Sequence, residues 1–270
     1  MHVSKPKVIS HGIVRQYTIE FSGIKTDIEI HLIQAAQYGV HDYIAYVIDQ
    51  VPDWTILMPL DQIVDWIGSG VKPERAIKKG LEKIGVKPTR ENLEIATNVF
   101  NRWFNHYGAL TPLLLMDDIT DIYINKAGTK FGLGGIYIEH TTLGRIQAVI
   151  GWEPIEVRKG KKVIKTITFD HNAFVDYLIR RIAMRTRTAI TAYNPAASVV
   201  DPEFGVRLSV EAEPVNPGSI SVRVLPRKPW TLVDMVRNGM INTRDAATLW
   251  LLAEHKVPLL FIGPMGSGKT

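Results

Sequence analysis

Apolar and polar residues alternate with a period of two near the start of the chain, and this alternation predicts a β-hairpin over residues 13–33. The apolar positions of its two arms are Ile13, Tyr17, Ile19 and Phe21, then Ile24, Ile28, Ile30 and Leu32. Ser22-Gly23 separates the arms, which is the length of a tight two-residue turn. The apolar stretch Tyr43–Ile48 fits either a strand or a helix.

From Pro59 the apolar residues recur at helical spacing, and three short helices are predicted over residues 59–68, 73–84 and 89–108. Thr89 is expected to cap the third helix, and Gly108 to end it. Residues 1–108 therefore form a predicted strand pair followed by a small helical bundle. Lys72–Arg90 holds seven basic and two acidic residues. This stretch fits a solvated helix face, or a contact with anionic lipid or a partner.

Shorter β patterns begin near Leu110, and they predict an α+β domain over residues 109–225. Its expected strands and hairpin are Asp121–Asn125, Gly135–His140, Arg145–Ile150, a hairpin with its tip at Lys159–Lys162, Val206–Glu213 and Ser219–Leu225. Asp170 is expected to cap a helix whose buried face is formed by Phe174, Val175, Leu178, Ile179, Ile182 and Ala183. Arg180, Arg181 and Arg185 on that helix suit either salt bridges on an exposed face or a subunit interface.

The last part of the sequence predicts a linker and the beginning of a different domain. Two prolines bracket residues 226–229, and we place the linker at 226–233. Asn242 is expected to open a helix. The five-residue apolar run Pro258–Ile262 is typical of a strand buried on both faces of a parallel sheet. Residues 234–270 are therefore expected to start a RecA-like α/β domain.

Composition narrows the class of protein without naming its function. Hydrophobic residues make up 46% of the 270 residues, as in a soluble globular protein, and the net charge is +5 with a pI near 9.3. The absence of cysteine excludes disulfides, thiol chemistry and cysteine zinc sites. No apolar run approaches the roughly 20 residues of a membrane span. We expect a cytoplasmic protein whose membrane role, if any, is peripheral.

A glycine-rich motif carries the chemistry. Residues 263–270 match the P-loop pattern G-x-x-x-x-G-K-[ST]. The nucleotide-binding candidates are Gly263, Gly266, Ser267, Gly268, Lys269 and Thr270. Glycines allow successive amide groups to surround a phosphate, Lys269 would reach the β- and γ-phosphates, and the Thr270 hydroxyl would bind Mg²⁺. The alternative interpretation is an incidental glycine-rich turn.

The motif lies at the last residue of the chain, without a later strand to supply an acidic residue. We therefore expect the chain to be a fragment of a longer protein and to be inactive by itself. It could remain monomeric.

Several segments in this order resemble the ATPases of type II and type IV secretion, which include pilus, archaellum and conjugation motors. The resemblance runs from about Tyr107 to Thr270. The similar segments are Asp118–Asn125, Ile136–His140, Phe174–Arg187, Gly205–Leu208, Ser221–Val224, Leu232–Met240 and the P-loop. Residues 1–106 are less similar, although a helical N-terminal module is common in archaeal members.

The resemblance implies a PAS-like N-terminal domain beside a RecA-like core, six subunits in a ring, and ATP with Mg²⁺ between the two domains. It places the catalytic roles on Lys269 and on the arginines Arg207 and Arg223, which would stabilise the charge of the transferring phosphate. It also implies a polytopic membrane platform protein as partner, peripheral location at the inner face of the cell membrane, and no direct binding of nucleic acid.

The chain departs from the family pattern around both arginines. Phe204-Gly205-Val206-Arg207 stands where members often have D-G-x-R, and Val224 follows Arg223 where they often have R-K. Two other functions stay open: a DNA-transfer ATPase of the same fold, and a non-catalytic docking module for a membrane partner. His106 and His140 are expected to be structural, and Trp103 and Trp230 to be packing residues.

Overall fold

The computed structural model describes residues 13–21, 24–34, 43–49, 51–126, 135–149, 155–159, 162–167, 169–225 and 230–263. The chain divides into two compact units, Met1–Leu225 and Pro226–Thr270, and each is considered by itself. The fold class is α+β, as the sequence predicts. The domain boundary expected at residues 108 and 109 stays a prediction.

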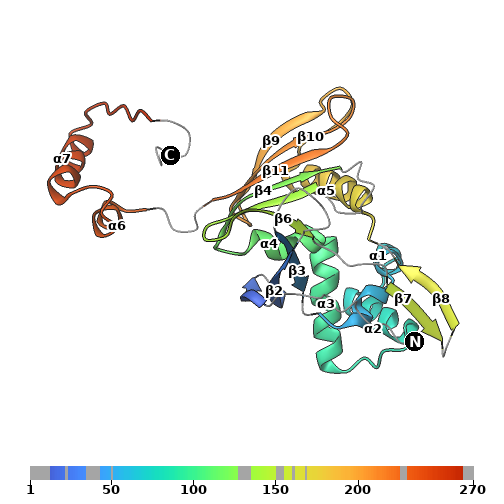
Figure 1. Cartoon of the computed structure of the whole chain (residues 1–270). Helices are drawn as coiled ribbons and strands as arrows, with labels where there is room; N and C mark the ends of the chain where they lie inside the picture. Colours follow the sequence, from blue (N-terminus) through green and yellow to red (C-terminus); the bar gives the residue numbers. More distant parts are fainter. Residues whose placement is uncertain are drawn as a thin grey trace. The chain divides into compact units, whose positions relative to one another are not determined.

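Nine strands of the described residues form one sheet in the order β1-β2-β3-β6-β5-β4-β11-β10-β9 (Figure 1). The strands are β1 Ile13–Phe21, β2 Ile24–Gln34, β3 Tyr43–Asp49, β4 Ile119–Asn125, β5 Gly135–His140, β6 Gly144–Val149, β9 Ala196–Asp201, β10 Val206–Glu211 and β11 Ser219–Val224. All neighbours are antiparallel except β3 and β6, which pair in parallel. This parallel pairing joins the N-terminal strands to the rest of the sheet.

The local strand predictions agree with this sheet. Phe21 pairs with Ile24 at the end of the predicted hairpin, whose turn residues lie outside the described part. The ambiguous stretch Tyr43–Ile48 is a strand. The predicted basic hairpin forms a separate two-stranded sheet of β7 Ile155–Lys159 and β8 Lys162–Ile167.

Strand β9 was not predicted from the sequence. Its residues Ala196, Ala197 and Ser198 have little preference for strands, and only Val199 and Val200 favour one. The strand forms because β10 offers it a complete row of backbone partners, from Val206–Asp201 to Glu211–Ala196. Tertiary pairing thus outweighs local propensity here.

The helices begin and end close to their sequence signals. They are η1 Asp53–Leu57, α1 Leu60–Gly68, α2 Pro73–Lys83, α3 Arg90–Phe104, η2 Gly108–Leu110, α4 Thr111–Leu114, α5 His171–Thr186, α6 Leu232–Arg237 and α7 Thr243–Glu254. The side chain of Thr89 accepts a hydrogen bond from the Asn92 amide, and that of Asp170 accepts one from the Ala173 amide. Asn242 caps α7 in the same way.

The apolar side chains of the first unit gather in two clusters. One lies among η1 and helices α1 to α3, with Ile63, Leu81 and Phe100 among its buried members. The other lies between the sheet and helices α4 and α5, where Phe174 and Leu178 of α5 are buried with strand residues such as Val222. Trp103 at the end of α3 packs against both clusters. The prediction that Trp103 is a packing residue is confirmed.

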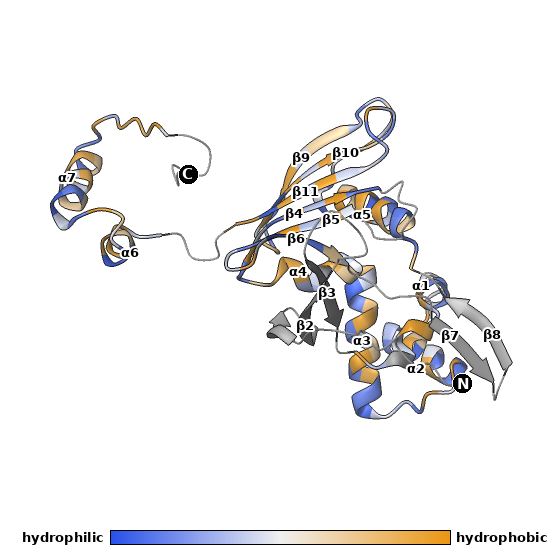
Figure 2. Ribbon diagram, viewed as in Figure 1, coloured by the Kyte–Doolittle hydropathy of each residue, from blue (hydrophilic) through white to orange (hydrophobic). Residues whose placement is uncertain are grey.

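The second unit differs from its prediction. Residues 258–262 form no strand, and Figure 2 shows the stretch after α7 as an irregular ribbon with mostly hydrophobic colouring. The apolar side chains of this stretch are exposed, Leu260 to 84% and Ile262 to 86%. The predicted buried strand is therefore wrong for this structure. A strand of a parallel sheet takes its hydrogen bonds from neighbouring strands, and no described residue pairs with this segment.

Gly108 has both a left-handed backbone conformation and a close contact with the Trp103 ring, so this position does not accommodate a side chain. Its φ is +57°, and a Cβ placed there would lie 2.8 Å from the Trp103 ring. We predict that Gly108→Ala lowers the free energy of unfolding by about 3 kcal/mol, from the left-handed backbone and the clash together. Urea unfolding followed by Trp fluorescence measures the change.

Gly144→Ala is the matched control, since Gly144 has φ +72° but no atom within 4 Å of the added Cβ. This variant should lose only about 1 kcal/mol, from the backbone alone. Equal losses in the two variants would contradict the role given to the Trp103 contact.

Candidate functional site

The sheet of strands β4 to β6 and β9 to β11 has one buried and one open face. Residues of even number on β10 and β11 are buried, except the partly buried Val224, and those of odd number point to the other side. Arg207 of β10 and Arg223 of β11 lie on the open side. The two residues are direct cross-strand partners, so the two arginines predicted as phosphate ligands are indeed brought together.

Charged residues continue this line across the open face. Arg223 is opposite Asp121 of β4, Asp121 is opposite Glu139 of β5, and Glu139 is opposite Arg145 of β6. We call these five residues, from Arg207 to Arg145, the charged row. Three positive and two negative side chains leave it with one unmatched positive charge.

Arg223 has a defined partner in this row. Its Nε donates a hydrogen bond of 2.9 Å to Oδ1 of Asp121. The arginine side chain is 68% exposed, while that of Asp121 is only 17% exposed. The hydrogen bond and the charge of Asp121 raise the pKa of the Arg223 guanidinium. Sequence reasoning missed this partner, although Asp121 stands in the motif that carries the resemblance.

Arg207 is the unmatched charge. Its Nε donates a hydrogen bond of 3.3 Å to the Ser198 hydroxyl, and it forms no ion pair within the described part of the chain. Like charges that face each other across two strands repel, since their Cβ atoms are only about 5 Å apart. An anion that bridges Arg207 and Arg223 would remove this repulsion, and a polyphosphate has the charge and the oxygen acceptors to do so.

The neighbouring row on the same face is uncharged. Ser209 and Ser221 pair in register, followed by Tyr123 and Tyr137 on β4 and β5. The guanidinium of Arg145 lies over both tyrosine rings, 5.3 Å and 5.4 Å from their centres. Aromatic and arginine side chains therefore extend the open face beyond the arginine pair.

The structure does not test the predicted P-loop. Gly263 is described, but residues 264–270, with Gly266, Ser267, Gly268, Lys269 and Thr270, lie outside the described residues. Their assignment to nucleotide and Mg²⁺ stays a prediction.

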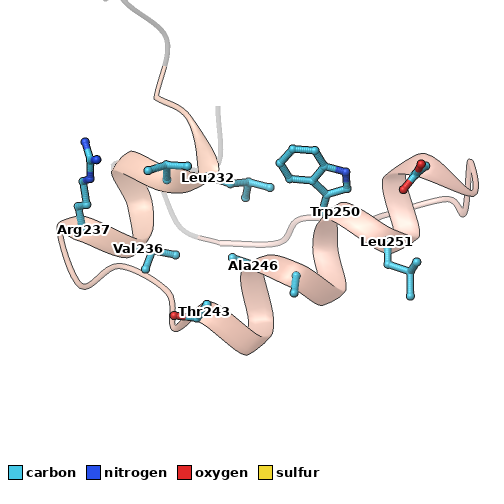
Figure 3. Close-up of a pocket in the computed structure, with 10 residues that line it drawn as sticks. Leu232, Val236, Arg237, Thr243, Ala246, Trp250 and Leu251 are labelled. Atoms are coloured by element: carbon cyan, nitrogen blue, oxygen red, sulfur yellow. The ribbon is translucent and has the colours of Figure 1, made fainter.

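An apolar groove lies between α6 and α7 of the second unit. Its volume is about 460 Å³, and Figure 3 shows the side chains that line it. Leu232 and Val236 come from α6, and Ala246, Trp250 and Leu251 from α7. Thr231 holds α6 in place through a reciprocal capping box with Asp234. The lining of this groove is mainly apolar, and it lacks the convergent polar side chains that a catalytic site requires.

Two of the three arginines of α5, which were expected on an exposed helix face, make structural contacts instead. Arg185 pairs with Asp201 at 2.8 Å and with Glu203 at 2.7 Å, and it lies over the rings of Tyr107 and Phe204. Arg181 donates a hydrogen bond of 2.8 Å to the Trp103 carbonyl. Arg180 alone of the three is exposed. The exposed-face prediction is thus wrong for Arg181 and Arg185, which tie α5 to the end of α3.

Asp201 is the buried centre of this network. Tyr107 Oη donates a hydrogen bond of 2.6 Å to Oδ2 of Asp201, the same atom that receives the bond from Arg185. Burial by itself raises the pKa of Asp201, but the hydrogen bonds from Arg185 and Tyr107 outweigh it, and the pKa lies below its usual value. Burial and the bond to Asp201 raise the pKa of Tyr107.

The remaining sequence candidates have ordinary packing roles. Nδ1 of the buried His140 accepts hydrogen bonds from the amides of Thr142 and Leu143, which is a turn-stabilising contact. Burial, followed by the charge of Arg185, lowers the pKa of His106, whose ring packs on Phe204. The seven basic residues of Lys72–Arg90 are exposed, and Lys79 lies over the Trp66 ring of its own bundle. This agrees with a solvated helix face.

No group of three or more His, Asp or Glu side chains in the described ranges is placed to hold a metal ion. Among the helices of those ranges, none combines the length and the apolarity that crossing a bilayer requires.

Comparisons with known proteins find little. No protein-family model matches the chain, and no curated protein matches it. Among solved structures, the chain is similar to the VirB11 ATPase from the Brucella suis type IV secretion system in complex with sulphate, with 17% identity and a TM-score of 0.32. The match covers 55% of this chain and 40% of that one, so it spans less than half of the neighbour's length. A likeness of this size fixes neither family nor function.

The Asp201 network predicts a pH-dependent stability. The pKa of Asp201 is lower in the folded state than in the unfolded state, where it is about 4. The ionised carboxylate therefore stabilises the fold fully above about pH 4. This stabilisation is lost as the pH falls through the pKa of the folded state. Asp201→Asn should therefore cost about 3 kcal/mol of unfolding free energy at pH 7 and progressively less below pH 4.

Urea unfolding of the unsubstituted protein and of Asp201→Asn, each over a series of pH values, checks this expectation. Glu203→Gln is the control, since Glu203 pairs with the same arginine but its side chain is 45% exposed, and its effect should be smaller. A cost of Asp201→Asn that stays constant from pH 7 to pH 3 would rule out the carboxylate as the cause.

Proposed function

We propose that the chain is the N-terminal part of a secretion or pilus-assembly ATPase, and that Arg207 and Arg223 bind the phosphates of its nucleotide. The observation that carries the proposal is the arginine pair on the open sheet face. Two permanently charged guanidinium groups are cross-strand partners, while only one of them has a carboxylate partner among the described residues. Such a pair fits the oxygens of a polyphosphate.

The P-loop sequence supports the same ligand from a second side. Residues 263–270 have the glycines, the lysine and the hydroxyl residue that phosphate binding requires. Lys269 would contact the β- and γ-phosphates, and Thr270 would hold Mg²⁺ through its hydroxyl. ATP supplies the transferable phosphoryl group when it is bound. Arg207 and Arg223 would neutralise the charge that develops on that group, and their own side chains need no proton transfer to do so.

The larger assembly belongs to the same proposal. The resemblance of the sequence to secretion ATPases supports a homo-hexamer of the complete protein, peripheral at the inner face of the cell membrane and bound to a polytopic platform protein. ATP hydrolysis would then change the closure of one domain on the other, which converts chemical energy into movement. A DNA-transfer ATPase of the same fold would differ in its stimulation by DNA.

The first test measures the contribution of the P-loop to nucleotide binding. We predict that Lys269→Ala weakens binding of ATP to the chain by about a hundredfold, because the P-loop lysine is a main contact to the phosphates and only the arginine pair then remains. Titration with a fluorescent ATP analogue in the presence of Mg²⁺ measures it. Arg180→Ala is the control, since this exposed arginine of α5 lies on neither element.

The second test concerns turnover by the complete ATPase that we propose. Arg207→Ala and Arg223→Ala should each lower kcat by about a thousandfold, as removal of an arginine finger does. Phosphate release at saturating ATP, with native mass measured beside it, gives both rate and assembly. Unchanged turnover in both variants would contradict the proposed role of Arg207 and Arg223 in phosphate binding.

A second candidate function is a docking module formed by the first unit. Tyr123, Tyr137 and Arg145 on the open face are of the kinds enriched at the centres of protein interfaces. On this hypothesis residues 1–225 retain a membrane platform protein in a pull-down without nucleotide, and Tyr123→Ala with Tyr137→Ala removes the retention. Retention that requires ATP favours the motor instead.

A further inference from the structure

We propose that Asp121 is a positioning residue, which holds the guanidinium of Arg223 so that its two terminal nitrogens face an anion. This inference rests on the proposed function of the arginine pair. It adds a residue of β4 to the arginine pair that the sequence places on β10 and β11.

The geometry of the contact supports this role. Asp121 receives the hydrogen bond of Nε, at 2.9 Å, and no hydrogen bond from Nη1 or Nη2 of Arg223 occurs within the described residues. Nε lies on the side of the guanidinium nearest the chain, and the terminal nitrogens form the opposite edge. A carboxylate bound at Nε fixes the plane of the group and leaves the other edge available.

The difference in exposure between Asp121 and Arg223 supports the same roles, in which Asp121 orients the guanidinium and Arg223 binds the anion. Asp121 is 17% exposed and its backbone pairs with β11 and β5 on either side, so the carboxylate is held by the sheet. Arg223 is 68% exposed, so its outer edge is open to solvent. A long side chain loses rotational freedom when an anion immobilises it, and a partner that has already fixed its plane reduces that loss.

A competing effect of Asp121 has the opposite sign. A carboxylate close to a bound anion repels it, and removal of that charge should strengthen binding. The two effects separate in two variants. Asp121→Asn keeps an oxygen acceptor for Nε but loses the charge, whereas Asp121→Ala loses both.

The charged row contains its own control. Glu139 follows Asp121 in the row and lies one strand further from the arginine pair, and its nearest cation is Arg145, at 3.7 Å. Glu139→Ala therefore removes a negative charge from the same face without freeing Arg223.

The experiment measures binding of inorganic tripolyphosphate to the 270-residue chain at low salt by calorimetry. All proteins carry Lys269→Ala so that the P-loop does not contribute. We expect Asp121→Ala to weaken binding about tenfold, close to the effect of Arg223→Ala, because one charge-assisted hydrogen bond loses its orientation. Asp121→Asn should bind as well as the parent or better, and Glu139→Ala should stay within about twofold.

Two readouts distinguish positioning from a loss of structure. The Nε–H proton of Arg223 should be visible by NMR in the parent and in Asp121→Asn, and should exchange rapidly with water in Asp121→Ala. In an Arg223→Lys background, where no Nε–H remains, Asp121→Ala should leave the affinity unchanged or raise it. A general loss of structure caused by Asp121→Ala would instead lower the affinity in the Arg223→Lys background as well.

The outcomes assign failure to one proposal or the other. If Arg207→Ala and Arg223→Ala leave tripolyphosphate binding unchanged, the proposed function loses its phosphate contacts and Asp121 loses its role with them. If Arg223→Ala weakens binding but Asp121→Ala strengthens it, the arginine site stands and Asp121 is a competitor of the anion. Equal weakening by Asp121→Asn and Asp121→Ala also overturns positioning through the Nε hydrogen bond.

Discussion

The packing of α5 against one face of the sheet determines what the other face presents. Strand side chains alternate, so each residue buried against Phe174, Val175 or Leu178 obliges its neighbour to point outward. Val206, Leu208 and Val222 face the helix. Arg207 and Arg223 are thereby exposed and opposed, although like charges gain nothing from such a pairing. A shift of β10 by one residue would bury Arg207, so the apolar core protects the charged row from rearrangement.

A second constraint holds α5 itself. Arg185 joins the last turn of the helix to Asp201 at the end of β9, and Tyr107 reaches the same carboxylate from the residues that follow α3. Because both donors meet one buried acceptor, Asp201 ties the last turn of α5 and the residues after α3 to the end of β9. The helix that sets the open face is thus fixed by polar contacts at its end and by apolar contacts along its length.

The sequence was most informative where one short segment carries a complete signal. The hairpin of β1 and β2, the caps Thr89 and Asp170, and the strands that bear the two arginines were all predicted from neighbouring residues. Prediction failed where the signal is shared between distant segments. Asp121 and Arg223 are 102 residues apart, and the exposed run Pro258–Ile262 would become a strand only beside others. The pairing of Arg185 with Asp201 could likewise not be predicted from neighbouring residues, because Asp201 belongs to β9, which was not predicted.

Trp103 belongs to both apolar clusters of the first unit, where its ring meets Phe174 and Tyr177 of α5 edge-on or tilted. A bundle and a sheet that shared no side chain would melt independently, each at its own temperature. Because one indole packs against both clusters, opening of either one removes a contact from the other, so the two should melt together in a single cooperative transition.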